Sequence, residues 1–121
     1  MTTLTTTRGK SVNAIAWTLQ IVCAMMFLGA GGSKLAGAQM MVQMFDALGA
    51  GQWFRYVTGA IEVTSALLLL VPSLAFFGAL ALAGAVITHL FFIGGNPAMP
   101  IVLFAATVAI AWLRRPMSGI E

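Results

Sequence analysis

Apolar stretches alternate with short polar or glycine-rich segments along almost the whole chain. A helix that crosses a membrane needs about 20 mainly apolar residues, and a helix of about 16 can cross a thin region. The stretches of this length are Val12–Gly31, Tyr56–Val71, Leu74–Ile93 and Ala98–Leu113. The pattern therefore predicts an all-α integral membrane protein that folds as an antiparallel four-helix bundle. Residues 12–115 form its single domain, between a polar, disordered tail at residues 1–11 and a short tail at residues 116–121.

The only long connection, Ser33–Phe54, joins the first two predicted spans. Apolar side chains recur in it at helical spacing, with glutamine and aspartate between them. The apolar positions are Met40, Met41, Met44, Phe45 and Leu48. Such a pattern predicts a short amphipathic helix lying in the membrane interface. We favour a surface linker over a lid that covers a site, because methionine-rich faces are adaptable packing surfaces.

Spans two and three are separated by only Pro72 and Ser73, which predicts an antiparallel hairpin with the two helices in contact. Small residues in span three offer faces for close helix packing. They are Gly78, Ala79, Ala81, Ala83, Gly84 and Ala85. In span one, Gly31 and Gly32 suit close backbone approach and can also end the helix. Asn96 precedes Pro97 and predicts the N-cap of span four.

Composition agrees with a membrane protein: 60% of the 121 residues are hydrophobic and 7% are charged. A soluble domain has about 25% charged residues, so the expected surroundings are a lipid bilayer. The net charge of +3 comes from basic residues near span ends, which is typical of membrane anchors, and we expect no nucleic-acid partner. Span one exceeds the usual signal-peptide core of about 7–15 residues, so we expect it to be retained.

The basic residues also predict the orientation. Arg8 and Lys10 precede span one, and Arg114 and Arg115 follow span four, whereas Lys34 and Arg55 share the long loop with Asp46. An excess of basic residues marks the cytoplasmic side. We therefore expect both termini in the cytoplasm.

The main site candidate is Glu62, an acid inside the second predicted span. Ionisable groups within a membrane are costly and are site candidates by default. Glu62 lies about 10 Å along its helix from Arg55, and His89 lies about 7–8 Å before the end of span three. The hairpin puts both at similar depth, so we expect a Glu62–His89 pair that binds a ligand or exchanges protons. Lys34 lies at the same end of span one and can reach it.

Each candidate has a structural alternative. For Lys34 and Arg55 we favour basic side chains that reach lipid headgroups, although Arg55 at a helix N-terminus opposes the macrodipole. His89 can be a neutral imidazole bonded to a neighbour, and Glu62 a protonated acid that fixes packing. Expected supporting residues are Arg55, Tyr56, Thr58, Gly59, Ser65, Thr88 and Asn96. Together with the lone Cys23, these groups supply too few ligands for a closed metal site.

At this point the sequence resembles a known family. The segments FLGAGGSKLAG, MFDALG, TGAIEVTSALLLLVP and GAVITHL, with a closing arginine pair, are similar in order and spacing to the DoxX-like family of small bacterial membrane proteins. The elements that match are Gly31, Gly32, Lys34, Gly59, Glu62, Thr88 and His89. The resemblance implies a four-span fold in the bacterial cytoplasmic membrane. In some relatives it also implies quinone-coupled sulfur oxidation, with such a chain as a subunit of a thiosulfate:quinone oxidoreductase.

Two functions of different classes follow. The first is an accessory subunit of a quinone-linked redox system, with a small amphipathic ligand at Glu62 and His89, assisted by Lys34. The second is a non-catalytic assembly or interaction protein, in which the polar pair only fixes helix packing and the methionine-rich helix docks a partner. A transporter is a third function, and it would need a homo-oligomer to build a path. No cysteine motif handles sulfur in this chain, so we do not expect an independent enzyme.

Overall fold

The computed structural model describes residues 9–116, and every regular element in that range is helical. The elements are α2 (Gly9–Ala36), α3 (Gln39–Leu48), α4 (Gln52–Leu69), α5 (Ala75–Thr88), the π-helix η1 (His89–Ile93) and α6 (Ala98–Leu113). The predicted all-α class is confirmed. The tails at residues 1–8 and 117–121 lie outside the described residues.

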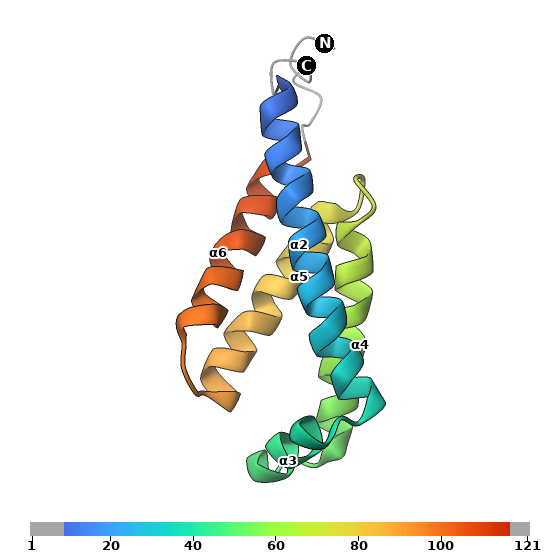
Figure 1. The fold of residues 1–121 in the computed structure, drawn as a ribbon, viewed down its shortest axis with the longest axis vertical. Helices are drawn as coiled ribbons and strands as arrows, with labels where there is room; N and C mark the ends of the chain where they lie inside the picture. The colour runs from blue at the N-terminus through green and yellow to red at the C-terminus, as the bar shows by residue number, and fades with distance from the viewer. Residues whose placement is uncertain (1–8, 117–121) are drawn as a thin grey trace.

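The longer helices form an antiparallel bundle (Figure 1). Around the bundle, α2 contacts α4, α4 contacts α5, α5 contacts α6, and α6 returns to α2. The start of α2 and the end of α6 therefore lie at one end of the bundle. The short helix α3 lies across the opposite end, where it contacts α2, α4 and η1.

Two of the described helices are long and apolar enough to cross a membrane, namely Gly9–Ala36 and the continuous helix Ala75–Ile93. Helix α6 is apolar but shorter. Helix α4 does not meet the same criterion, and its charged residues Arg55 and Glu62 interrupt its apolar sequence. The first and third predicted spans are thus the ones that length and composition support.

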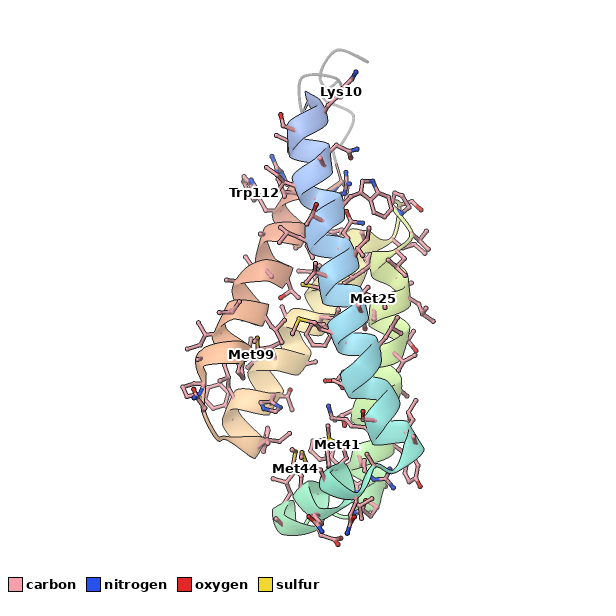
Figure 2. The ribbon with its side chains drawn as sticks, viewed as in Figure 1. Lys10, Met25, Met41, Met44, Met99 and Trp112 are labelled. Atoms are coloured by element: carbon pink, nitrogen blue, oxygen red, sulfur yellow. The ribbon has the colours of Figure 1, made fainter. Side chains whose placement is uncertain are left out.

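Several predicted elements are confirmed. Helix α6 has the predicted bounds, α3 occupies most of the predicted amphipathic segment, and α4 and α5 form the hairpin around Pro72 and Ser73. The predicted N-cap at Asn96 is one residue too early, because the N-cap of α6 is Pro97; the Asn96 side chain still accepts a hydrogen bond from the N–H of Ala98 at 2.9 Å. Met41 and Met44 project from α3 toward the interior of the bundle (Figure 2).

Helix α2 is longer at both ends than the predicted span. It begins at Gly9, so residues 9–11 are helical rather than part of a polar tail. It continues through Gly31 and ends before Gly37, which has φ +76°. The N–H of Ala38 bonds to the carbonyl of Ser33 at 3.0 Å, and this left-handed closure satisfies carbonyls at the helix end. Gly31 therefore does not end the helix.

The last turn of the continuous helix Ala75–Ile93 is the π-helix η1, which the apolar pattern does not predict. Here the N–H of Gly94 bonds to the carbonyl of His89 at 3.1 Å, and Gly94 and Gly95 have positive φ. The wider π-helical turn occurs in few helices and is often found at functional sites. In this protein it begins at His89, one of the candidate residues.

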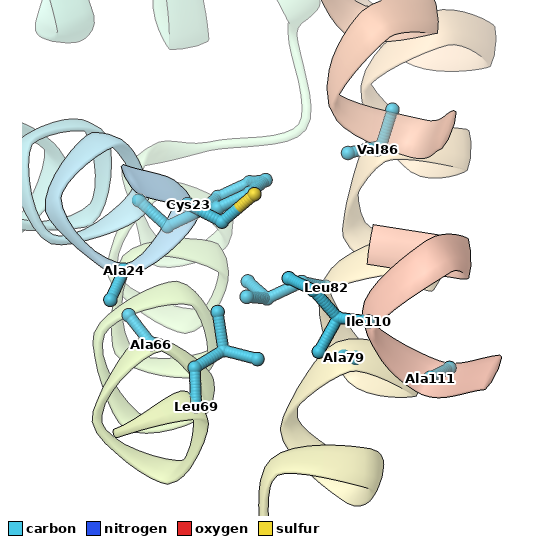
Figure 3. Close-up of a cluster of buried hydrophobic side chains, with 10 residues drawn as sticks. Cys23, Ala24, Ala66, Leu69, Ala79, Leu82, Val86, Ile110 and Ala111 are labelled. Carbon is cyan, nitrogen blue, oxygen red and sulfur yellow. The ribbon is translucent and has the colours of Figure 1, made fainter. Parts of the chain in front are cut away.

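The apolar core lies among α2, α4, α5 and α6 (Figure 3), and Leu69, Ala79 and Ala111 place much of it toward the end of the bundle away from α3. Leu69 from α4, Leu82 from α5 and Ile110 from α6 are fully buried in this core. Small side chains, Ala66 and Ala79 among them, allow these helices to approach closely. The core thus closes one end of the bundle and leaves the end beside α3 less tightly filled.

Candidate functional site

Close contact between α2 and α4 places the charged candidates side by side. A Cβ added at Gly31 would lie 2.9 Å from the carbonyl oxygen of Gly59 and 3.0 Å from the Cβ of Glu62. A Cβ added at Gly59 would lie 3.0 Å from the Cβ of Lys34. Each charged residue therefore faces a glycine on the neighbouring helix. Only glycine fits at both positions, and the two backbones approach as they do at small-residue contacts between membrane helices.

The resulting ion pair is direct and buried. Nζ of Lys34 donates a hydrogen bond to Oε1 of Glu62 at 2.7 Å, and the two residues are 5% and 8% exposed. Lys34 lies in the last turn of α2, where the macrodipole favours a cation. The expectation that Lys34 reaches out to lipid headgroups is wrong, because the facing carboxylate holds it inside the bundle.

Arg55 is also buried, so the same expectation is wrong for this residue. Its guanidinium donates to the main-chain carbonyl of Lys34 and, through Nε, to the side-chain oxygen of Gln52 at 2.6 Å. It also lies 4.3 Å from the ring centre of Tyr56. The carbonyl of Lys34 lies at the negative C-terminal end of α2, where the N–H of Gly37 also bonds to it at 3.3 Å. The attraction of this negative end for the guanidinium explains how a cation is held at the N-terminus of α4, where the macrodipole opposes it.

Hydrogen bonds connect Arg55, through Gln52, to α3. Gln52 donates to Oδ1 of Asp46 at 2.9 Å and to the carbonyl of Val42 at 3.1 Å. Phe45 is fully buried and packs edge-to-face on Phe54, with ring centres 5.8 Å apart. These contacts fix α3 across the open end of the bundle.

Two cavities meet at the ion pair. The larger cavity has a volume of about 570 Å³ and lies between α2, α3, α6 and the π-helix η1. Met41 and Met44 of α3 are part of its wall. The smaller, about 440 Å³, lies between α4 and α5. Lys34, Glu62 and His89 line both cavities. The surface-linker interpretation of α3 is therefore incomplete, because the helix also covers the larger cavity.

His89 lies at this junction, as the depth argument predicted. The ion-pair partner of Glu62 is Lys34, however, and the His89 ring makes no hydrogen bond to any residue in the described range 9–116. The ring is partly exposed at the cavity wall. Its nitrogens are free to donate to a ligand or accept from one.

A family model described as the DoxX-like family matches residues 18–112, which is most of the chain. The chain belongs to the DoxX-like family. Membership identifies it as a membrane protein, and the two long apolar helices agree with this. No curated protein and no solved structure matches the sequence. The matched range contains the whole ion-pair site of this DoxX-like protein.

The other candidates differ in position. Thr58 and Thr88 line the smaller cavity and Asn96 the larger one, while Gly59 and Arg55 shape the site from outside the cavities. Tyr56 is half-exposed and meets the site only through Arg55. Ser65 is buried against α5 near Gly78 and lines neither cavity.

Sequence reasoning did not find the apolar cavity walls. They include Met26, Phe27, Met99 and Leu103 in the larger cavity, and Phe54, Ile61, Ala81, Gly84 and Ala85 in the smaller. The only signal was the run of small residues in span three, which we interpreted as a packing surface. One glycine in that run, Gly78, does pack closely, with an added Cβ 2.7 Å from the carbonyl oxygen of Ser65.

Proposed function

We propose that this DoxX-like protein is an accessory subunit of a membrane redox system and binds a quinone where its two cavities meet. The observation that supports this is the buried Lys34–Glu62 pair, which lines two apolar cavities together with the unbonded imidazole of His89. Cavities of about 300–1,000 Å³ with few polar groups are typical of small-molecule sites. Both cavities fall in this range.

The residues suit proton exchange with such a ligand. Reducing a quinone to a hydroquinone requires two electrons and two protons, so each carbonyl oxygen becomes a hydroxyl. Lysine, glutamate and histidine side chains exchange protons and not electrons, so a partner redox protein supplies the electrons. His89 and Lys34 donate hydrogen bonds to the quinone oxygens, and Glu62 accepts from the hydroquinone. The pair is neutral as a whole, which suits an uncharged ring.

The decisive variant is Glu62→Gln, because it keeps the size of the side chain and an oxygen that can accept from Lys34. A hydrogen bond to a charged group contributes about 1.5–3 kcal/mol, so we expect at least roughly tenfold weaker quinone binding. Binding is measured by titration of purified protein in nanodiscs, with empty nanodiscs as the blank. Asp46→Asn is the matched control, since Asp46 lines neither cavity.

Quinone-linked oxidation by membranes containing the protein should fall with Glu62→Gln and stay constant with Asp46→Asn. Wild-type protein that binds no quinone, combined with unchanged membrane activity in Glu62→Gln, would refute the proposal.

A non-catalytic interaction protein is the second candidate. It is supported by the direct 2.7 Å contact of Lys34 with Glu62, which satisfies both groups without a ligand, and by Met40 of α3, which is 72% exposed. Met40→Asp should then abolish co-purification of the partner, and Glu62→Gln should change only expression or stability. Phe45 is unsuitable for this test because it is fully buried. Gln43→Asp, at another exposed position on α3, is the control.

We further propose four membrane spans with both termini in the cytoplasm of a bacterium. Lys10, Arg114 and Arg115 lie toward one end of the bundle, whereas Lys34 and Arg55 at the other end are buried and paired. Basic residues near span ends are therefore more numerous at the end away from α3, and the positive-inside rule counts basic residues rather than net charge.

Orientation is tested by labelling single cysteines in a Cys23→Ser background, because Cys23 is buried and its removal leaves only the introduced thiol. Ala50→Cys should react with an impermeant reagent in intact cells. Ser11→Cys should react only after permeabilisation, and the reverse pattern would overturn the topology. Both positions are exposed.

A further inference from the structure

The smaller cavity is a groove on the outer side of the bundle, between α4 and α5. Its apolar walls include Val57 and Ile61 of α4, which are 43% and 46% exposed, and Ala81, Gly84 and Ala85 of α5. In a bilayer this outer surface faces lipid. The groove is therefore accessible to an apolar molecule from within the membrane.

Along α5 and η1, the apolar wall residues Ala81, Gly84 and Ala85 come before the polar residues Thr88 and His89. The hydroxyl of Thr58 donates to the carbonyl of Phe54 at 2.9 Å, and that of Thr88 donates to the carbonyl of Gly84 at 3.0 Å. Both hydroxyls are thus occupied by their own helices. The other polar side chains lining the groove are Lys34, Glu62 and His89. A ligand that fills the groove must therefore have one polar part and one apolar part.

Gly84 has no packing role that explains it. A Cβ added there would meet nothing within 4 Å, whereas a Cβ added at Gly78 on the same helix would lie 2.7 Å from the carbonyl oxygen of Ser65. Glycine inside a helix costs roughly 1 kcal/mol relative to alanine. The close contact with α4 accounts for Gly78, but not for Gly84. Because Gly84 lines the groove, a side chain at this position would occupy part of it.

We infer that the groove between α4 and α5 holds the single apolar chain of a ligand whose uncharged polar head lies at Lys34, Glu62 and His89. Gly84 determines how bulky a chain the groove admits. The inference rests on the proposed quinone site and specifies the ligand class as a head with one chain, such as an isoprenoid quinone. A phospholipid fits less well, because its anionic phosphate would meet a lysine already neutralised by Glu62.

Gly84→Leu tests the inference, and Gly29→Leu is a matched control. Both glycines lie inside helices, and a Cβ added at either would meet nothing within 4 Å. The carbonyl of each accepts a hydrogen bond from the hydroxyl group of the residue four positions later. Gly29 lines neither cavity. Leucine has a higher helix propensity than glycine, so neither variant should lower the melting temperature.

Two quinones are titrated into nanodiscs containing each protein: decylubiquinone, which has a ten-carbon chain, and duroquinone, which has none. Gly84→Leu should weaken binding of decylubiquinone at least about fivefold, the lower end of overpacking effects, and leave duroquinone binding unchanged. Gly29→Leu should change neither.

Equal decylubiquinone affinity in wild type and Gly84→Leu would contradict the inference that the groove holds the apolar chain, and would leave the proposed quinone site unaffected. An equal loss of affinity for both quinones would mean that Gly84 lies beside the head of the ligand, and this would also contradict the inference. If wild type binds neither quinone, the proposed function fails as well. Loss of co-purified phospholipid in Gly84→Leu, detected by mass spectrometry with quinone binding unchanged, would assign the groove to a membrane lipid instead.

Discussion

The two ends of the bundle both bury polar side chains, but only one end has cavities beside them. At the end away from α3, Gln20 is fully buried; it donates to the carbonyl of Leu69 at 2.7 Å and accepts from Nε of Arg114 at 2.7 Å. None of these three residues lines either cavity. At the α3 end, Lys34 and Glu62 are paired just as closely, and both cavities open onto them.

The two buried, paired polar groups differ in what surrounds them. Gln20 joins α2, α4 and α6 next to the apolar core, and its contacts account for its burial. The Lys34–Glu62 pair also joins two helices, yet its surroundings include unfilled space and a partly exposed histidine without a hydrogen-bond partner among the described residues. The cavity and the available imidazole distinguish the second end.

The largest effect should come from leaving a charge unpaired at the α3 end. Lys34→Met removes the partner of buried Glu62, and breaking one side of a buried ion pair costs about 3–5 kcal/mol. The double variant Lys34→Met, Glu62→Met should recover most of this loss, because no charge remains unpaired. Unfolding in mixed micelles measures the free energy of unfolding of the single and the double variant. A double variant as unstable as the single one would show that the pair is not the source of the effect.

A smaller loss should follow from separating α2 and α4. Gly31→Val places atoms where the Gly59 carbonyl and the Glu62 side chain lie, so we expect a cost toward the upper end of the roughly 1–3 kcal/mol typical of overpacking. Gly29→Val, on the same helix in open space, should cost far less. Equal stability of the two variants by the same assay would contradict the close contact.

Gln20→Leu should separate stability from binding. It leaves the buried carbonyl of Leu69 without this hydrogen bond, and an unsatisfied buried group costs about 1–3 kcal/mol. Thermal stability should fall, while quinone affinity at the other end stays the same. A large change in quinone affinity would mean that the two ends are coupled.

The smallest effect should come from Gln52→Ala, which removes the link between α3 and Arg55. The side chain is only partly buried, so the expected loss is about 0.5–1.5 kcal/mol. Amide hydrogen exchange should become faster in α3 and stay unchanged in α6. Gln43→Ala, at an exposed position on α3, is the control and should alter neither. Faster exchange throughout the bundle would show that the link supports more than α3.

The sequence by itself determined the all-helical class, most of the helical elements and the end of the bundle where the candidates gather. Local patterns carry this information: periodic apolar residues predict α3, length and turn residues predict α6, and the short connection around Pro72 and Ser73, residues 70–74 in the structure, forces a hairpin. Given that hairpin, residue counting alone brought Glu62 and His89 to similar depth.

Only the tertiary structure decided which residue pairs with Glu62 and which glycines are packed. Lys34 rather than His89 holds the carboxylate because Gly31 and Gly59 draw α2 against α4, and this contact depends on helix rotation that no periodicity encodes. Gly78 and Gly84 look alike in the sequence, yet one lies against a neighbouring backbone and the other faces open space. The distance between helices, which is a property of the packed bundle, makes that difference.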